Sequence, residues 1–142
     1  MSQSGAQLVY VAGLGCRRGC SSAQLFELLQ QALAPHGLQP SDLGALASSN
    51  HKQDEPGLRQ LAEQLCLPIA WLPASQLSPY HERLRQTSVL SLQITGSAGV
   101  AEASALAQVE VLSGQRGELL GEKRRSANAT CALARAQLLE IS

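Results

Sequence analysis

Blocks of apolar and polar residues alternate along the first half of the chain and predict strands and helices in turn. The apolar segment 8–12 has the length of a buried strand, and leucines and alanines recur at helical spacing over 25–33. Ser21, with Gln24 three residues later, fits a capping box, so we expect this helix to begin near Ser22.

The same alternation continues to residue 72. Residues 44–47 predict a second strand, and a polar loop follows over 48–57, in which Asp54 is expected to cap the next helix. Leucines at helical spacing predict a helix over 58–65, and 69–72 predict a third strand. Strands that alternate with helices imply parallel strands with right-handed crossovers, so the sequence predicts an α/β fold.

The second half is less regular. Ser75 is expected to cap a short helical turn that ends before Pro79, and 88–94 is compatible with either a helix or a strand. Residues 100–107 strongly favour a helix, with Glu102 in its first turn, where a carboxylate complements the helix dipole.

Two short strands are predicted over 118–122 and 129–134, around the basic loop 123–128. Their pairing would give an antiparallel hairpin at one side of the sheet, with Lys123 near its mouth. We therefore expect a single three-layer domain over residues 1–142, with a mixed, mostly parallel sheet, a hairpin near the C-terminus and a loose tail over residues 1–7.

Composition then excludes some classes of protein. The formal net charge is zero, so neither a nucleic acid nor a membrane surface is an expected partner. No apolar run has the length of a membrane span and the first residues do not form a signal peptide, so we expect a cytoplasmic protein. The four cysteines match no zinc motif; we expect free thiols, a buried Cys66, and neither a metal nor a cofactor. A redox or metal pair of Cys16 and Cys20 is the alternative.

The strongest candidate for chemistry is the segment 13–22, Gly-Leu-Gly-Cys-Arg-Arg-Gly-Cys-Ser-Ser. Its glycine spacing is not that of a dinucleotide-binding fingerprint, and no Gly-Lys-Ser/Thr of a phosphate-binding loop follows. Free N–H groups near Ser21, at the start of a helix, would converge with Arg17 and Arg18 on an anion, either a carboxylate or a phosphate. The alternative is that the glycines only form a tight turn and the arginines are solvated.

Both polar loops follow strands of the predicted parallel sheet. Ligands of such sheets collect beyond the carboxyl ends of the strands, so we expect 13–22 and 48–57 to form one site. In the second loop, Lys52 and Glu55 are candidate functional residues; an exposed salt link between them is the alternative interpretation.

Four motifs come in order along the chain: 13–19, 52–58, 99–106, and Lys123 followed by 128–135. Together they resemble the cobalamin-biosynthesis family made of CobE and the C-terminal domain of CbiG, over about residues 8–135. The resemblance implies a role in building the corrin ring of vitamin B12. CbiG proteins open a lactone on a cobalt-precorrin in the anaerobic route and release acetaldehyde. A free-standing copy of the domain, as this chain looks, is similar to CobE of the aerobic route, around the stage of ring contraction.

A corrin intermediate is an apolar disc with a rim of acetate and propionate groups, so its site needs cations and N–H donors at the rim. One hypothesis is an enzyme with lactone or ester hydrolase activity, in which Glu55, Glu102 or His51 activates water. Lys52, Lys123 or the loop amides would stabilise the oxyanion. The other is a non-catalytic carrier that hands the tetrapyrrole to other enzymes of the pathway. A nucleotide-phosphate site at the first loop is a remoter option. The residues expected to contact the ligand are Gly13, Gly15, Cys16, Arg17, Arg18, Ser21, Lys52 and Lys123.

Overall fold

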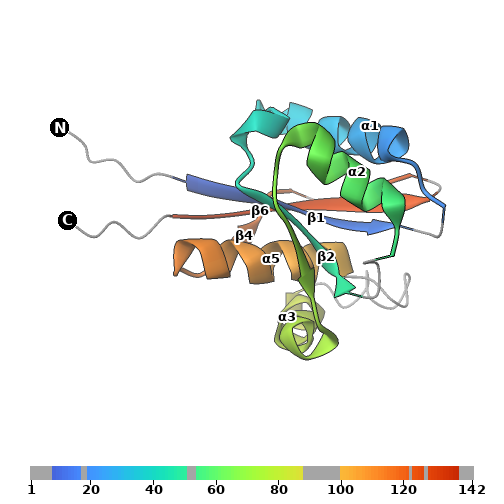
Figure 1. Cartoon of the computed structure of the whole chain (residues 1–142). Coiled ribbons are helices and arrows are strands. Elements are labelled where there is room, and N and C mark those ends of the chain that lie inside the picture. Colours follow the sequence, from blue (N-terminus) through green and yellow to red (C-terminus); the bar gives the residue numbers. More distant parts are fainter. Residues whose placement is uncertain are drawn as a thin grey trace.

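The computed structural model describes residues 8–16, 19–50, 54–87, 100–121, 123–126 and 128–137 (Figure 1). The elements in chain order are β1 (Leu8–Cys16), α1 (Ser22–Leu33), η1 (Ala34–His36), η2 (Pro40–Asp42), β2 (Ala45–Ser49), α2 (Pro56–Leu65), β3 (Ile69–Leu72), α3 (Ala74–Thr87), α5 (Val100–Ser113), β4 (Glu118–Leu119), β5 (Arg124–Arg125) and β6 (Ala129–Gln137). None of the helices that the described residues form has the length and apolar character that crossing a membrane requires.

The strands that the structure describes form one mixed sheet in the order β3-β2-β1-β6-β4, with β5 also paired to β6. Strands β1, β2 and β3 are parallel, and β6 runs antiparallel to β1 along its whole length, from Leu8 opposite Gln137 to Cys16 opposite Ala129. Helices α1 and α2 cover one face, and α5 and α3 cover the other (Figure 1). The predicted three-layer α/β architecture with a mixed sheet is thus confirmed, with parallel pairing among β1, β2 and β3 and antiparallel pairing of β6 with β1, β4 and β5.

Two apolar cores lie on the two faces because successive side chains of a strand point to opposite sides. In β1, Leu14 and Cys16 pack with the leucines of α1 and α2. Val11, on the other face, packs with the alanines of α5 and with Leu77 of α3. The small side chains of α5 allow this helix to lie close to the sheet, as its composition predicted.

The start of the first helix is as predicted. Ser21 is the N-cap of α1: its Oγ accepts a hydrogen bond from Gln24 N at 3.1 Å, and Ser21 N donates to Gln24 Oε1 at 3.3 Å. This capping box satisfies two backbone donors that the helix itself leaves unpaired.

Strand β1 is longer than the sequence indicated, because the predicted loop begins only after Cys16. Gly13 and Gly15 are strand residues rather than turn residues. A Cβ at Gly13 would lie 1.9 Å from Ala101 O of α5, so this glycine permits contact between the main chain of the strand and the helix. Strand β2 likewise extends through Ser48 and Ser49, which the prediction assigned to the following loop.

Three local predictions are wrong. Glu55, not Asp54, is the N-cap of α2, because Pro56 occupies the first helical position. Pro79 lies inside α3, which continues to Thr87, so it does not end a short turn. Cys66 is exposed; it is the C-cap of α2, with a left-handed backbone conformation at φ of 57°.

The predicted C-terminal hairpin is present, with different bounds and a different place. Strand β4 is only two residues long, part of the expected basic loop forms β5, and β6 extends to Gln137. Because β6 pairs with β1 on one side and with β4 and β5 on the other, it lies within the sheet rather than at its side. The predicted tail 1–7 and the ambiguous segment 88–94 lie outside the described residues.

Candidate functional site

The described parts of the predicted functional segments lie where β1, β2 and β3 end, at Cys16, Ser49 and Leu72; we call this the carboxyl edge (Figure 1). Helices α1, α2 and α5 begin at this edge. Because Cys16 pairs with Ala129, the hairpin segment that carries Lys123 reaches the same edge. Segments more than 100 residues apart in sequence are therefore neighbours.

Glu55 joins the first two polar loops. Gly19 N donates a hydrogen bond to Glu55 Oε1 at 3.0 Å, although 36 residues separate them. Gly57, in the first turn of α2, lies so close to the start of α1 that a Cβ there would be 2.1 Å from Cys20 O. The N–H of Gly19, in the loop that the sequence predicted to bind an anion, thus has the protein's own carboxylate as its acceptor.

Ser21, in the described part of the same loop, is also engaged within the protein. Both the Oγ and the N–H of Ser21 take part in the capping box with Gln24. The role of Ser21 that the structure describes is therefore to begin α1, and its contact with a ligand stays a prediction.

Cys16 and Cys20 come together around the turn, and the described cysteines, Cys66 and Cys131 included, are free thiols. Burial raises the pKa of the Cys20 thiol, and the charge of the nearby Glu55 carboxylate acts in the same direction. A hydrogen bond with the Cys16 side chain partly offsets this increase. Both thiols are buried in the core beside α1, so Cys16 faces away from α5.

Glu102 and Lys123 form the second joined pair. Lys123 Nζ donates to Glu102 Oε1 at 3.4 Å, and the side chains are only 14% and 19% exposed. Glu102 lies in the first turn of α5, as predicted, and Lys123 lies directly before β5. The pair therefore connects the alanine-rich helix to the hairpin on the α5 side of the sheet.

Gly13 and Gly15 lie under this pair rather than in a loop. Gly13 contacts the first turns of α5, and a Cβ at Gly15 would be 2.9 Å from Thr130 Oγ1 of β6. The two glycines allow α5 and β6 to approach β1 closely, which supports the position of Glu102 and Lys123.

Two buried serines at this edge did not emerge from the sequence as functional candidates. Ser48 Oγ donates to Leu14 O at 2.7 Å, and Ser104 Oγ donates to Ala101 O at 3.1 Å and lies 3.5 Å from Ala47 O. They fix the ends of β1 and β2 against each other and against α5. The sequence carries only a weak indication of these two serines. Ser48 directly follows an apolar predicted strand, and Ser104 is a small polar residue within an apolar helix.

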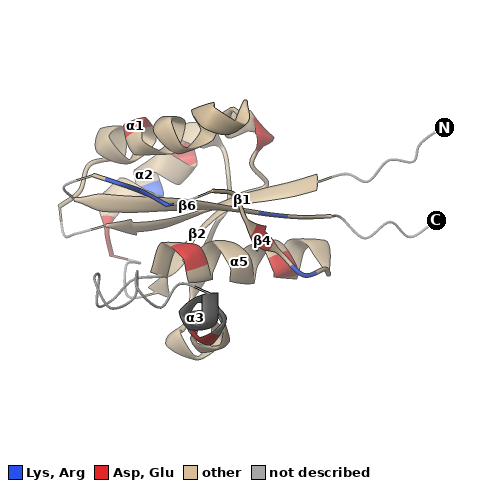
Figure 2. Ribbon diagram, turned by 180° about the vertical axis from the view of Figure 1, so that it is seen from behind, with Lys and Arg blue, Asp and Glu red and all other residues tan. Residues whose placement is uncertain are grey.

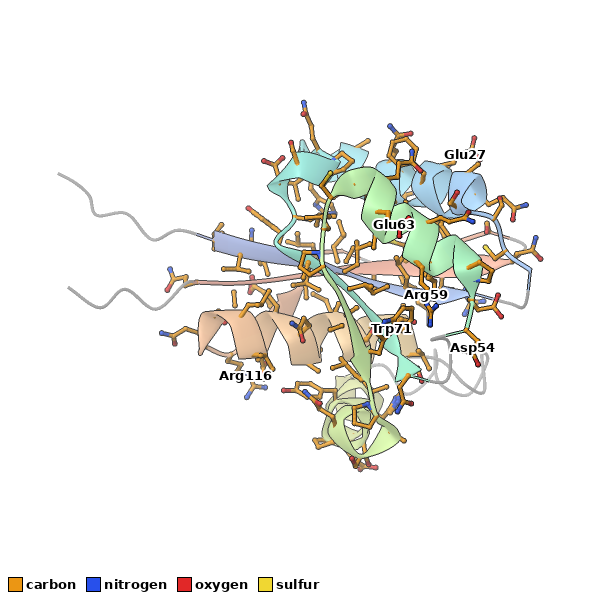
Figure 3. The ribbon with its side chains drawn as sticks, viewed as in Figure 1. Glu27, Asp54, Arg59, Glu63, Trp71 and Arg116 are labelled. Atoms are coloured by element: carbon orange, nitrogen blue, oxygen red, sulfur yellow. The ribbon has the colours of Figure 1, made fainter. Side chains whose placement is uncertain are left out.

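The basic residues of the last segment do not form one cluster. Arg135 Nε donates to Glu118 Oε2 at 3.0 Å on the hairpin, and basic positions are spread along the hairpin strands (Figure 2). Arg116 lies at the opposite end of α5 from the carboxyl edge, whereas Asp54 lies at that edge (Figure 3). Lys123, Arg124 and Arg125 are the described cations of this segment that lie near the edge.

Several predicted residues lie outside the described residues: Arg17, Arg18, His51 and Lys52. Among the described contacts, none joins the Gly19–Glu55 pair to the Glu102–Lys123 pair. A separate hollow of about 190 Å³ lies on the α1 side, and no described candidate residue lines it. Its lining residues are Gln24, Glu27, Leu28, Gln31, Ser126 and Asn128.

Within the described part of the chain, no group of three His, Cys, Asp or Glu side chains is placed to hold a metal ion. The described site is therefore made of two acid-containing pairs and the glycines beneath them, with the exposed strand β5 beside it. Such a set can hold and orient carboxylates, and it offers two carboxylates as proton acceptors.

Comparison with known proteins identifies the family. Residues 10–134 match the family described as cobalamin synthesis G C-terminus. Protein CobE of Sinorhizobium sp is 36% identical over 133 residues, which cover 94% of this chain and 82% of that protein. The cobalt-precorrin-5A hydrolase of Salmonella typhimurium is 32% identical over 124 residues, and the match spans 87% of this chain but only 33% of the hydrolase.

A solved structure agrees with these relationships. The crystal structure of CobE, a protein of the cobalamin (vitamin B12) biosynthetic pathway, superposes with a TM-score of 0.80 at 48% identity, covering 91% of each chain. The resemblance that the four motifs indicated is thereby confirmed. The chain belongs to the CobE/CbiG C-terminal family of cobalamin-biosynthesis proteins.

Proposed function

We propose that the chain binds and acts on a corrin intermediate with free carboxylate side chains, at the ring-contraction stage of the aerobic route. Its family membership and its similarity to CobE support the pathway, and the name of the Salmonella relative supports a precorrin as the ligand. The observation that carries the proposal is that the described parts of four separate motifs lie at the carboxyl edge.

The proposed reaction is hydrolysis of a lactone or ester on the ring. Water attacks the acyl carbon, the acyl C–O bond breaks, and the products are a carboxylic acid and an alcohol. Glu102 is the candidate that accepts the proton of water, and Lys123, at 3.4 Å from it, is the candidate that stabilises the oxyanion. Glu55 then has a positioning role, because its carboxylate holds the main chain at Gly19.

The proposal is tested by mixing the protein with a lactone-bearing precorrin and following absorbance together with product mass. We expect a product heavier by one water, and loss of turnover in Glu102→Gln with binding retained. Glu118→Gln is the matched control, because Glu118 pairs with Arg135 away from the carboxyl edge. Turnover by Glu102→Gln at the wild-type rate would remove Glu102 from the mechanism.

A carrier is the second candidate. It is favoured by one observation, that Glu55 and Glu102 each already accept a hydrogen bond. A carrier needs the same rim contacts and no base, and it would pass the corrin to other enzymes of the pathway. Stoichiometric binding without any product, unchanged in Glu102→Gln, would select it over the hydrolase.

We place this activity in the cytoplasm. The free thiols of the described cysteines support that location, because a reducing compartment maintains thiols. Fractionation of the producing cells, followed by immunodetection of the protein, tests it directly.

A further inference from the structure

Strand β5 sends its two arginines to opposite faces of the sheet. Arg124 pairs with Cys131 of β6, and Arg125 pairs with Thr130. Residues directly opposite each other in an antiparallel pair have side chains on the same face, and neighbours along a strand alternate. The side chain of Arg124 therefore lies on the same face of the sheet as that of Cys131, and the side chain of Arg125 lies on the same face as that of Thr130.

Those faces are known from packing. Cys131 is fully buried in the core beside α1 and α2. Thr130 Oγ1 lies where a Cβ of Gly15 would point, and Gly15 shares its face with Gly13, which contacts α5. Arg124 is therefore on the α1 side, and Arg125 is on the α5 side.

The position of Lys123 supports the same assignment independently. Lys123 contacts Glu102 of α5 and precedes Arg125 by two residues in an extended segment, so both side chains lie on one face. Lys123 and Glu102 together carry no net charge. Arg125 is exposed and, within the described residues, no carboxylate pairs with it, so it adds a net positive charge on this side.

The α1 side differs in its electrostatics. There the N–H of Gly19 already has Glu55 as its acceptor, and the N–H groups of Ser21 and Gln24 are paired in the capping box. The start of α1 therefore has its own carboxylate, whereas the start of α5 faces a neutral ion pair and an additional arginine.

We infer that Arg125 binds a carboxylate at the rim of the ligand and that the ligand lies on the α5 side of the carboxyl edge. This inference rests on the proposed function. The planar guanidinium donates two parallel hydrogen bonds to a carboxylate, which the amine of Lys123 does not. Arg125 is thereby assigned as a ligand-binding residue, and Arg124 is not.

The two arginines provide a matched pair of variants, Arg125→Gln and Arg124→Gln. The probe is cobyrinic acid, a corrin with free carboxylates, and the control probe is the corresponding corrin amide; dissociation constants come from fluorescence or absorbance titration. We expect Arg125→Gln to weaken binding of the acid about tenfold, with a smaller salt dependence. Arg124→Gln should change it less than about twofold, and neither variant should affect the amide.

Two failures are distinguishable. If wild-type protein binds neither probe, the proposed function fails, and this inference fails with it. If the wild type binds the acid and both variants bind it equally, or Arg124→Gln is the weaker, then only the assignment to Arg125 and to the α5 side is overturned. Equal unfolding temperatures of the variants, both altered at exposed positions, exclude misfolding as the cause.

Discussion

Gly13 shows how one residue decides the distance between two elements. Its main chain contacts α5 with no side chain between them, and the nearest atoms to an added Cβ belong to the backbone, Ala101 O and Ala105 N. A backbone cannot rotate away as a long side chain does, so the strand and the helix would have to separate.

We therefore expect Gly13→Ala to lower the free energy of unfolding by about 3 kcal/mol, because overpacking of a close contact is costly. Urea unfolding measures the change. Gly44→Ala is the control, since its Cβ would meet the nearest atom, Val9 Cγ1, at 3.5 Å, an ordinary contact. Equal losses in the two variants would show that close approach is not the cause.

The buried thiol of Cys131 should make the free energy of unfolding depend on pH. Burial raises the pKa of its thiol from 9.0 to about 12 in the folded protein. Below about pH 9 the thiol is protonated in both states; above it only the unfolded thiol ionises, until the folded one follows near pH 12. The free energy of unfolding should thus fall by about 1.4 kcal/mol per pH unit in this window.

Urea unfolding at about pH 9.5 and about pH 10.5 measures this slope, because both values lie between the two pKa values. Cys131→Ala should remove that component of the slope, whatever it does to stability at the lower pH. Cys66→Ala should retain it, because Cys66 is exposed. The same slope in the wild type and in Cys131→Ala would contradict the assignment.

At the scale of elements, α5 and the hairpin are joined by the Glu102–Lys123 pair. Its side chains are largely buried, whereas those of the Arg135–Glu118 pair are 40% and 61% exposed. Solvent screens an exposed pair strongly, so the two pairs should differ in coupling although both are ion pairs.

A double-mutant cycle with Glu102→Gln and Lys123→Gln should give a coupling energy of about 1 kcal/mol in urea unfolding. The cycle with Glu118→Gln and Arg135→Gln is the control, with an expected coupling below about 0.5 kcal/mol. A coupling at the first pair no larger than at the second would mean that α5 and the hairpin are held by apolar packing alone.

At the scale of the whole molecule, the starts of α1, α2 and α5 and the mouth of the hairpin lie at one edge, while η1 and the end of α5 lie away from it (Figure 1). A ligand bound at the carboxyl edge should therefore leave an asymmetric footprint. This follows from the topology, because parallel strands bring their carboxyl ends together.

Hydrogen exchange with and without cobyrinic acid measures that footprint. We expect slower exchange over 100–104 and 123–126, and unchanged exchange over 36–42 and 113–117. Hydrogen exchange of the protein mixed with the corrin amide is the control. Protection confined to the far end would place the ligand elsewhere, even if binding itself were tight.

The sequence by itself determined what depends on neighbours along the chain. Apolar periodicity located the first three strands and the helices between them, and Ser21 with Gln24 located the start of α1, because caps and helical faces involve residues only three or four apart. The motifs also determined the family, since they come in a fixed order.

The tertiary structure decided what depends on long-range pairing. In the folded protein β6 pairs with β1, and Glu55 accepts a hydrogen bond from Gly19, 36 residues away in sequence. Likewise, Lys123 donates a hydrogen bond to Glu102, 21 residues away. Neither periodicity nor composition contains the register of these contacts. The same register determines which of two adjacent arginines faces α5, because a shift by one residue would exchange their faces.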